Sequence, residues 1–169
     1  MSQNGAMSDW MLSPYPGHSS RRRITEPTPD ANVDAVQQTL AEYERLAIGT
    51  GEWNGTDAPE FSEDGVTWST AWVRPDVAPS DDDPHPVFAR ATVYRQGIKR
   101  PIVVVIRWDE ALPAVEPWRD LWLRKPATMF GAFALRAALR RAFRDAIGDH
   151  HAPDEQHTEP TTDTEGNEA

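Results

Sequence analysis

The first clear pattern in the chain is helical and lies between Asp30 and Ile48. Apolar residues recur there at steps of three and four, which places them on one stripe of an α-helix. Asp30 is a helix-capping residue type, and Gly49 stands where the pattern stops. We predict a helix over about residues 30–48 whose apolar stripe packs on a sheet. The stripe consists of Val33, Val36, Leu40, Tyr43 and Ala47.

The next pattern is an alternation of apolar and polar residues after a turn-rich stretch. Asp64-Gly65 is a hairpin-turn pair, and the alternation that follows predicts a strand over residues 66–72. The two-residue period of a strand places Trp68 and Trp72 on one face. Exposed tryptophans of this kind can stack on nucleic-acid bases, although core packing is the simpler role.

Two further apolar runs, residues 87–96 and 102–106, are separated by a short turn at Gly97. The first alternates, and the second, IVVVI, predicts the best buried strand in the chain. Together they predict an antiparallel hairpin that carries Lys99 and Arg100 at its turn.

Residues 127–147 are rich in alanine and leucine and predict a second long helix. Cations recur on it every four residues, so they stack along one face, where like charges repel each other. A row of this kind requires negative charge from outside the helix. A phosphate backbone or the carboxylates of the acidic first half of the chain would supply it. The row consists of Arg136, Arg140 and Arg144, with Arg141 beside it.

Charge is unevenly distributed along a chain whose formal net charge is -10. Residues 1–84 hold 5 Lys and Arg against 15 Asp and Glu, whereas residues 85–147 hold 12 against 5. Residues 148–169 hold no Lys or Arg and 7 Asp and Glu. A basic block between acidic flanks indicates either a polyanionic partner or a solvated basic face.

The two ends of the chain are polar. We predict a disordered arm over residues 1–28, which includes the basic triplet Arg21–Arg23, and a disordered acidic tail over residues 149–169. One domain over residues 29–148 remains. The N-terminus lacks the pattern of a secretory signal, and no stretch approaches the roughly 20 apolar residues of a membrane span, so we expect no membrane partner.

Composition excludes several classes of site. The chain has no cysteine, which excludes disulfides and cysteine-based zinc sites and fits the cytoplasm. Acidic groups at residues 63–64, 81–83 and 109–110 would be the ligands if the protein were a Mg²⁺-dependent nuclease, but solvated turns explain them more simply. No Gly-rich phosphate loop is present, so nucleotide chemistry is not indicated.

Three blocks of sequence, in this order, resemble the RecT family of phage single-strand annealing proteins and its Red-beta relatives. The first, in residues 45–72, contains GTGEWNG, DAPEF and EDGVTWSTAW. The second is ARATVYRQGIKRPI, and the third is WLRKPATMFGAFALRAALRRAF. The resemblance extends over about residues 40–155, where IGDHHAPDE is similar to the acidic close of that domain.

The resemblance implies an α+β fold, a small antiparallel sheet packed with helices. It also implies a bacterial cytoplasmic protein that binds single-stranded DNA in a basic groove, assembles into homo-oligomeric rings or filaments, and anneals complementary strands. Members act without nucleotide hydrolysis, so we expect no enzyme activity and no cofactor; Mg²⁺ is allowed but not required. A phage exonuclease or the host single-strand binding protein would be a partner of such a protein. Arg95, Arg140 and Arg141 match basic motif residues of the family.

Two departures from the family pattern leave an alternative open. Ala132 stands where the family usually has a lysine, and Arg136, one turn later, would restore that cation. Only about 40 dissimilar residues precede the first block, where the family has a longer N-terminal portion. A shortened relative that acts as a protein-interaction module, without annealing activity, is therefore the second hypothesis.

Our main hypothesis is a groove between the sheet and the 127–147 helix in which cations neutralise the phosphates of one DNA strand. The acidic tail would cover this groove when DNA is absent. The predicted DNA-binding residues are Arg95, Lys99, Arg100, Arg124, Lys125, Arg136, Arg140, Arg141 and Arg144.

Overall fold

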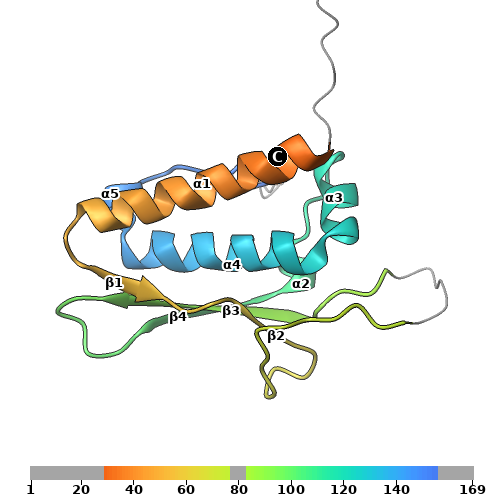
Figure 1. The fold of residues 1–169 in the computed structure, drawn as a ribbon, viewed down its shortest axis with the longest axis horizontal. Helices are drawn as coiled ribbons and strands as arrows, with labels where there is room; N and C mark the ends of the chain where they lie inside the picture. The colour runs from red at the N-terminus through yellow and green to blue at the C-terminus, as the bar shows by residue number, and fades with distance from the viewer. Residues whose placement is uncertain (1–28, 77–82, 156–169) are drawn as a thin grey trace, which may run out of the picture.

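The computed structural model describes residues 29–76 and 83–155. An antiparallel sheet forms one layer, the helix α4 lies across one of its faces, and the helix α1 lies on α4 (Figure 1). The α+β class predicted from the sequence is confirmed. In chain order the elements are α1 (Pro29–Gly49), β1 (Trp53–Thr56), β2 (Glu60–Ser62), β3 (Phe88–Arg95), β4 (Ile102–Arg107), α2 (Trp108–Ala111), α3 (Trp118–Arg124), α4 (Pro126–Ala142) and α5 (Arg144–Ile147).

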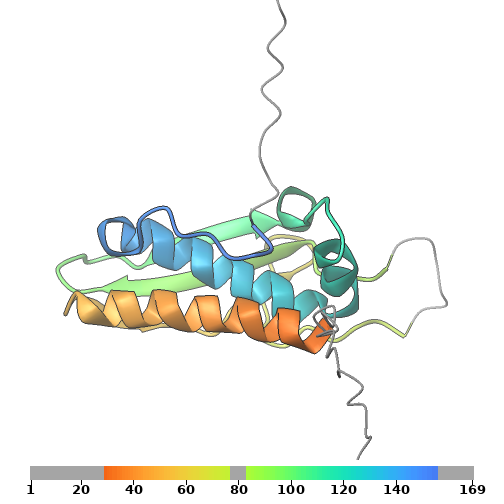
Figure 2. The same cartoon turned by 90° about the horizontal axis from the view of Figure 1, so that it is seen from above.

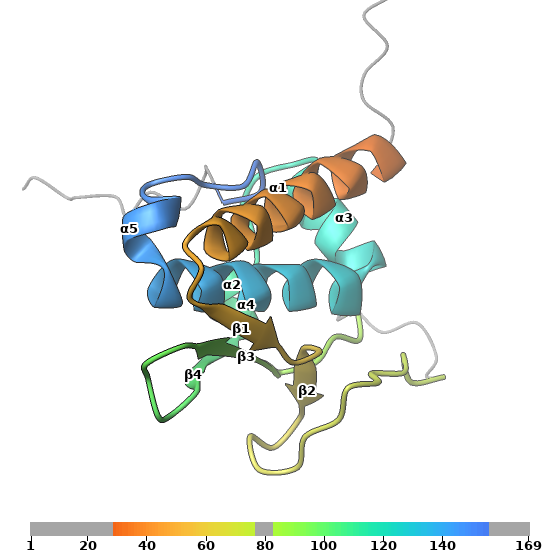
Figure 3. The same cartoon turned by 60° about the vertical axis from the view of Figure 1, so that its left-hand side comes forward.

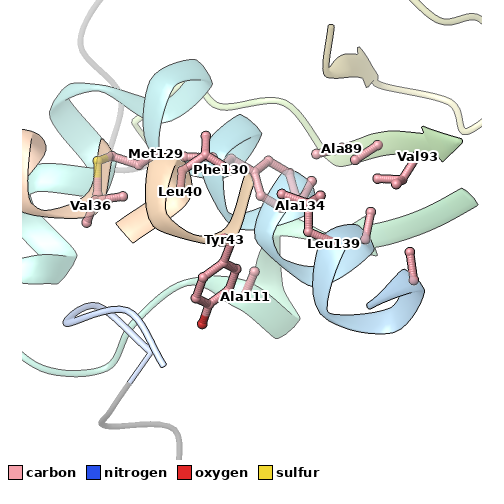
Figure 4. Packing of buried hydrophobic residues seen from close by; sticks show 14 of the residues in the cluster. Val36, Leu40, Tyr43, Ala89, Val93, Ala111, Met129, Phe130, Ala134 and Leu139 are labelled. Carbon is pink, nitrogen blue, oxygen red and sulfur yellow. The ribbon is translucent and has the colours of Figure 1, made fainter. Parts of the chain in front are cut away.

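Helix α1 confirms the predicted first helix, but its apolar stripe does not pack on the sheet. Its main contacts are with α4 and α5, and Figure 4 shows Val36 and Leu40 beside side chains of α4. The other side of α4 packs on β3, where Ala89 and Val93 are fully buried. Helix α4 is thus the middle layer, and it separates α1 from the sheet.

The hairpin β3–β4 is confirmed, with Ala91 opposite Val104 in antiparallel register. The prediction that residues 102–106 form the best buried strand in the chain is wrong, because β3 is more deeply buried than β4. Val103 is 40% exposed and Val105 is 52% exposed, whereas the alternate residues of β4 pack against the core. The reason is that helices cover one face of the sheet and leave the other without a helix in the described structure (Figure 3).

The predicted strand over residues 66–72 is also wrong. Within the described residues, its pairing is limited to one bridge between Phe61 and Ser69. The carboxylate of Asp64 accepts hydrogen bonds from the N–H groups of Val66 and Thr67 at 2.8 and 2.7 Å, and these contacts hold the pKa of Asp64 well below its usual range. A local side-chain cap of this kind competes with strand pairing, so the segment forms a loop.

The tryptophans of this loop have partners within the protein. The guanidinium of Arg90 lies 4.3 Å from the centre of the Trp68 ring. The indole N–H of Trp72 donates to Glu63 at 3.0 Å, and its ring packs against the core. The structure therefore gives the core-packing role to Trp72, whereas Trp68 is half-buried against Arg90.

The last helical region differs from the predicted continuous helix over residues 127–147. Helix α4 ends at Ala142, Phe143 has the non-helical angles φ -129° and ψ 42°, and α5 is a separate short helix. The chain then turns back along α4 (Figure 2). Residues 149–155, which the sequence places in the disordered tail, pack against the domain with Ala152 fully buried. The predicted arm over 1–28 and the rest of the tail lie outside the described residues.

None of the helices in residues 29–76 and 83–155 is long and apolar enough to cross a membrane.

Candidate nucleic-acid interface

Helix α4 carries the predicted arginine row, and its environment decides which of those arginines can meet a ligand. The sheet, α1, α3 and the segment after α5 surround it. Of its 17 residues, Thr128 and Arg141 alone are exposed in the described structure. Helix α4, which is apolar and contains no acidic residue, is therefore the central core helix. Most of its surface is covered by other parts of the protein and does not form a solvated basic face.

Arg136 lies in the interior and is 0% exposed. Its Nη2 donates to both carboxylate oxygens of Asp154 at 3.0 Å, and its Nε donates to Glu155 Oε1 at 2.8 Å. Its guanidinium also lies 5.9 Å from the centre of the Phe133 ring. Both carboxylates belong to residues 149–155, which we call the strap.

Arg140 is half-buried and binds the same strap. Its Nη2 donates to Glu155 Oε2 at 2.6 Å and to the hydroxyl oxygen of Tyr43 at 2.9 Å. The backbone carbonyl of His150 accepts hydrogen bonds from both Arg140 and Tyr43. The indole N–H of Trp122 donates to Asp154 at 3.2 Å. The strap is therefore held by donors from three helices, α1, α3 and α4.

The same surroundings shift the pKa values of the two strap carboxylates in opposite directions. Burial raises the pKa of Asp154, because Arg136 offsets only part of the desolvation. Burial also acts to raise the pKa of Glu155, but Arg136 and Arg140 together outweigh it and hold that pKa below its ordinary value. Glu155 is thus the anion on which the two guanidiniums converge.

These contacts correct the prediction that Arg136 and Arg140 are free to grip phosphate. The alternative left open by the sequence, internal ion pairs, is found for both residues. The carboxylates come from the segment after α5 instead of the acidic first half of the chain. Arg136 also does not restore an exposed cation in place of the lysine missing at Ala132, because it points into the protein.

Four other predicted residues are exposed and form no ion pair with any described residue. They lie on the β3–β4 turn, in the last turn of α4 and at the start of α5, elements that share one end of the molecule (Figures 1 and 3). We call this cluster the basic end. It consists of Lys99, Arg100, Arg141 and Arg144.

Arg95 holds the two halves of the basic end together. Its Nη1 donates to the carbonyl of Ala142, the last residue of α4, at 2.6 Å. Its Nε donates to Glu52 at 2.7 Å, and its guanidinium lies 5.1 Å from the centre of the Phe143 ring. Arg95 therefore positions the root of the β3–β4 turn against the end of α4, with its own charge already paired.

Arg124 and Lys125 lie at the opposite end of α4. Arg124 pairs with Asp120, and Lys125 pairs with Asp30 at 3.1 Å. At about 1.5 Å per residue, Lys125 and Arg141 are about 24 Å apart along the helix axis. The nine predicted residues therefore form no single row: four gather at the basic end, three hold internal contacts beside it, and two lie elsewhere.

The predicted groove between the sheet and the helix is filled. Core side chains of β3 and α4, including Val93, Ala134 and Leu139, occupy the space between the layers (Figure 4). An open hollow of about 320 Å³ does lie between α1 and α4, next to Leu40 and Leu135, but no cation lines it. The exposed predicted cations without ion pairs to described residues therefore lie on the surface of the basic end and not in a groove.

Sequence reasoning missed the strap and its partners. Asp154 and Glu155 lie in the predicted tail, Tyr43 is predicted only as a member of the apolar stripe, and Trp122 stands only in the third sequence block. The available signal was the unbalanced charge of Arg136 on an otherwise apolar helix, which requires a carboxylate that the linear sequence does not identify.

Replacing Glu155 with glutamine is expected to destabilise the domain by about 1–3 kcal/mol at neutral pH, because buried Arg136 and half-buried Arg140 lose their shared anion. The carboxylate contributes fully above its ordinary pKa of 4.5. That contribution is lost as the pH falls through this value towards the lower pKa of the folded state. Urea unfolding at pH 7 and pH 3.5 should therefore show a smaller difference between variant and wild type in acid. Exposed Glu110→Gln is the control, and an equal difference at both pH values would contradict the assignment.

Comparison with protein-family models, with curated proteins and with solved structures finds no match for this chain. The resemblance to the RecT family therefore rests on the three sequence blocks. Among the described residues, no three His, Asp or Glu side chains gather as ligands for a metal ion.

Proposed function

We propose that this domain binds single-stranded DNA at its basic end and promotes the annealing of complementary strands without nucleotide hydrolysis. The observation that supports the proposal most directly is the basic end itself. Four exposed cations without ion pairs to the described residues gather at one end of a protein whose net charge is -10. Against that overall charge, local attraction for a polyanion requires such a concentration of cations.

The composition of the basic end favours contact with the DNA backbone. Three of its four cations are arginines, whose planar guanidinium binds phosphate oxygens in pairs. Contacts to phosphate position a strand without reading its sequence. The base edges of a strand held in this way stay free to pair with a complement, which annealing requires. Assembly into a homo-oligomer, cytoplasmic location and partnership with an exonuclease or a single-strand binding protein are parts of the same proposal.

Salt dependence tests the proposal. Four phosphate contacts at about -0.7 each give a log–log slope of roughly -3, so affinity should fall roughly 50-fold between 50 and 200 mM salt. Fluorescence anisotropy with a labelled 30-nucleotide oligomer measures the slope, and quenching between complementary labelled oligomers measures annealing in the absence of ATP. An affinity that does not change with salt would refute electrostatic binding. Binding without faster annealing would support the DNA-binding part of the proposal and refute the annealing part.

A protein-interaction module is the second candidate, and the uncovered face of the sheet favours it. Val103, Val105 and Ile98, at 40%, 52% and 50% exposure, are apolar side chains of the β3–β4 hairpin outside the core. Exposed apolar patches often mark protein contacts. Absence of oligonucleotide binding at 50 mM salt would favour this candidate over the first.

A further inference from the structure

The strap covers two arginines with little apolar anchoring of its own. Of its seven residues, Ala152 is the fully buried apolar one, and Asp149, His150 and His151 are exposed. Its polar contacts to the domain include the two carboxylates on Arg136 and Arg140, the hydrogen bond from Trp122, and the hydrogen bonds from Tyr43 and Arg140 to the His150 carbonyl. An apolar anchor the size of one methyl group contributes little to the docking of the strap.

Ion pairs and hydrogen bonds between the strap and the arginines can be replaced by equivalent contacts from another anion. Buried ion pairs lose in desolvation much of what they gain in attraction, so their net contribution to docking is small. A phosphodiester offers the same charge and the same oxygen acceptors as Asp154 or Glu155. Nη1 of Arg136 and Nε of Arg140 are buried donors that have no hydrogen-bond partner among the described residues. The strap therefore does not use the full capacity of the two guanidiniums.

The strap also begins at the basic end. It follows α5 directly, and α5 starts at Arg144, which belongs to the basic end. Arg140, which binds Glu155, precedes exposed Arg141 in the last turn of α4. A strand bound to the exposed cations would thus lie next to the point where the strap leaves α5 (Figure 2).

We propose that residues 149–155 are a displaceable strap that competes with DNA: single-stranded DNA bound at the basic end displaces Asp154 and Glu155 and takes over Arg140 and Arg136. This inference rests on the proposed function and adds regulation to the same site. The strap lowers the affinity for short or weakly bound polyanions, and a strand long enough to replace both carboxylates extends its contacts from the basic end along α4.

A single cysteine reports strap opening directly, because the chain has none of its own. Ala152→Cys places a thiol at a buried strap position, and Ala138→Cys places one at an equally buried position on α4. Strap opening exposes only the first, whereas unfolding exposes both. We expect a saturating 30-nucleotide oligomer to accelerate thiol labelling of Ala152→Cys at least about fivefold and to leave Ala138→Cys unchanged. Protection or an unchanged rate at position 152 would overturn the proposal.

Fluorescence anisotropy in the same samples shows whether the oligomer binds, so a failure of DNA binding can be distinguished from a failure of strap displacement. If the oligomer binds and the thiol rate at position 152 does not rise, the strap proposal fails and DNA binding stands. If the oligomer does not bind at 50 mM salt, both fail.

A second measurement does not depend on a cysteine variant. The double change Asp154→Asn, Glu155→Gln removes the competing charges and should raise oligonucleotide affinity about five- to tenfold in protein shown by circular dichroism to be folded. The control, Asp34→Asn with Glu110→Gln, makes the same change in net charge at exposed positions outside the strap and the basic end. An equal gain in both double variants would mean that net charge alone is responsible, and the strap proposal would fail.

Discussion

Replacing Arg136 with alanine is expected to lower the free energy of unfolding by about 3–5 kcal/mol, a large part of the stability of a domain of this size. The change leaves Asp154 buried without its main cation and removes one of the two cations on Glu155. It also opens a cavity between α4 and the strap. Guanidinium chloride denaturation followed by circular dichroism measures the loss.

Two further variants show whether the loss comes from unpaired buried charge. Arg141→Ala removes the same side chain five residues along α4, at an exposed position, and should change stability by less than about 0.5 kcal/mol. Arg136→Met with Asp154→Leu removes both buried charges and should be clearly more stable than Arg136→Ala. If Arg136→Ala unfolded at the same denaturant concentration as Arg141→Ala, the buried ion network would not hold the strap.

The elements that the sequence predicts correctly are those in which one physical rule acts alone. The stripe of α1 and the alternation of β3 follow from periodicity, because each element turns its apolar positions towards α4. The strand predicted at residues 66–72 fails because the carboxylate of Asp64 caps its own backbone. Periodicity records which side chains share a face, and it does not register a local hydrogen bond that competes with pairing.

The arginine row fails as a prediction for a different reason. Spacing along a helix determines which side chains share a face, but only the tertiary structure determines what covers that face. Arg136 and Arg140 are one turn apart, as expected, and both meet the strap, whose position depends on the break at Phe143 and the chain reversal after α5. Arg141, on a neighbouring face, remains exposed. The arginine row without acidic neighbours therefore did indicate a need for negative charge from outside the helix. The strap carboxylates supply that charge to Arg136 and Arg140.

Neutralising all four cations of the basic end with glutamine is expected to lower affinity for single-stranded DNA several hundred-fold at 0.1 M salt. The estimate follows from four phosphate contacts, each of which releases about 0.7 counterion. The folded state should be unaffected, because none of the four side chains is buried or ion-paired within the described structure. The variant carries Lys99→Gln, Arg100→Gln, Arg141→Gln and Arg144→Gln.

The matched control makes the same change in net charge at the other end of the molecule, near α3 and the end of β4, with Arg74→Gln, Arg107→Gln, Arg119→Gln and Arg124→Gln. If binding is local to the basic end, the control should keep its salt slope near -3, whereas the basic-end variant should lose nearly all of it. Variants of the turn pair and the helix pair alone should each lose about half of the slope, because both contact one strand. Equal losses in the basic-end variant and the control would indicate attraction to the overall field of the protein, and the basic end would not be the binding site.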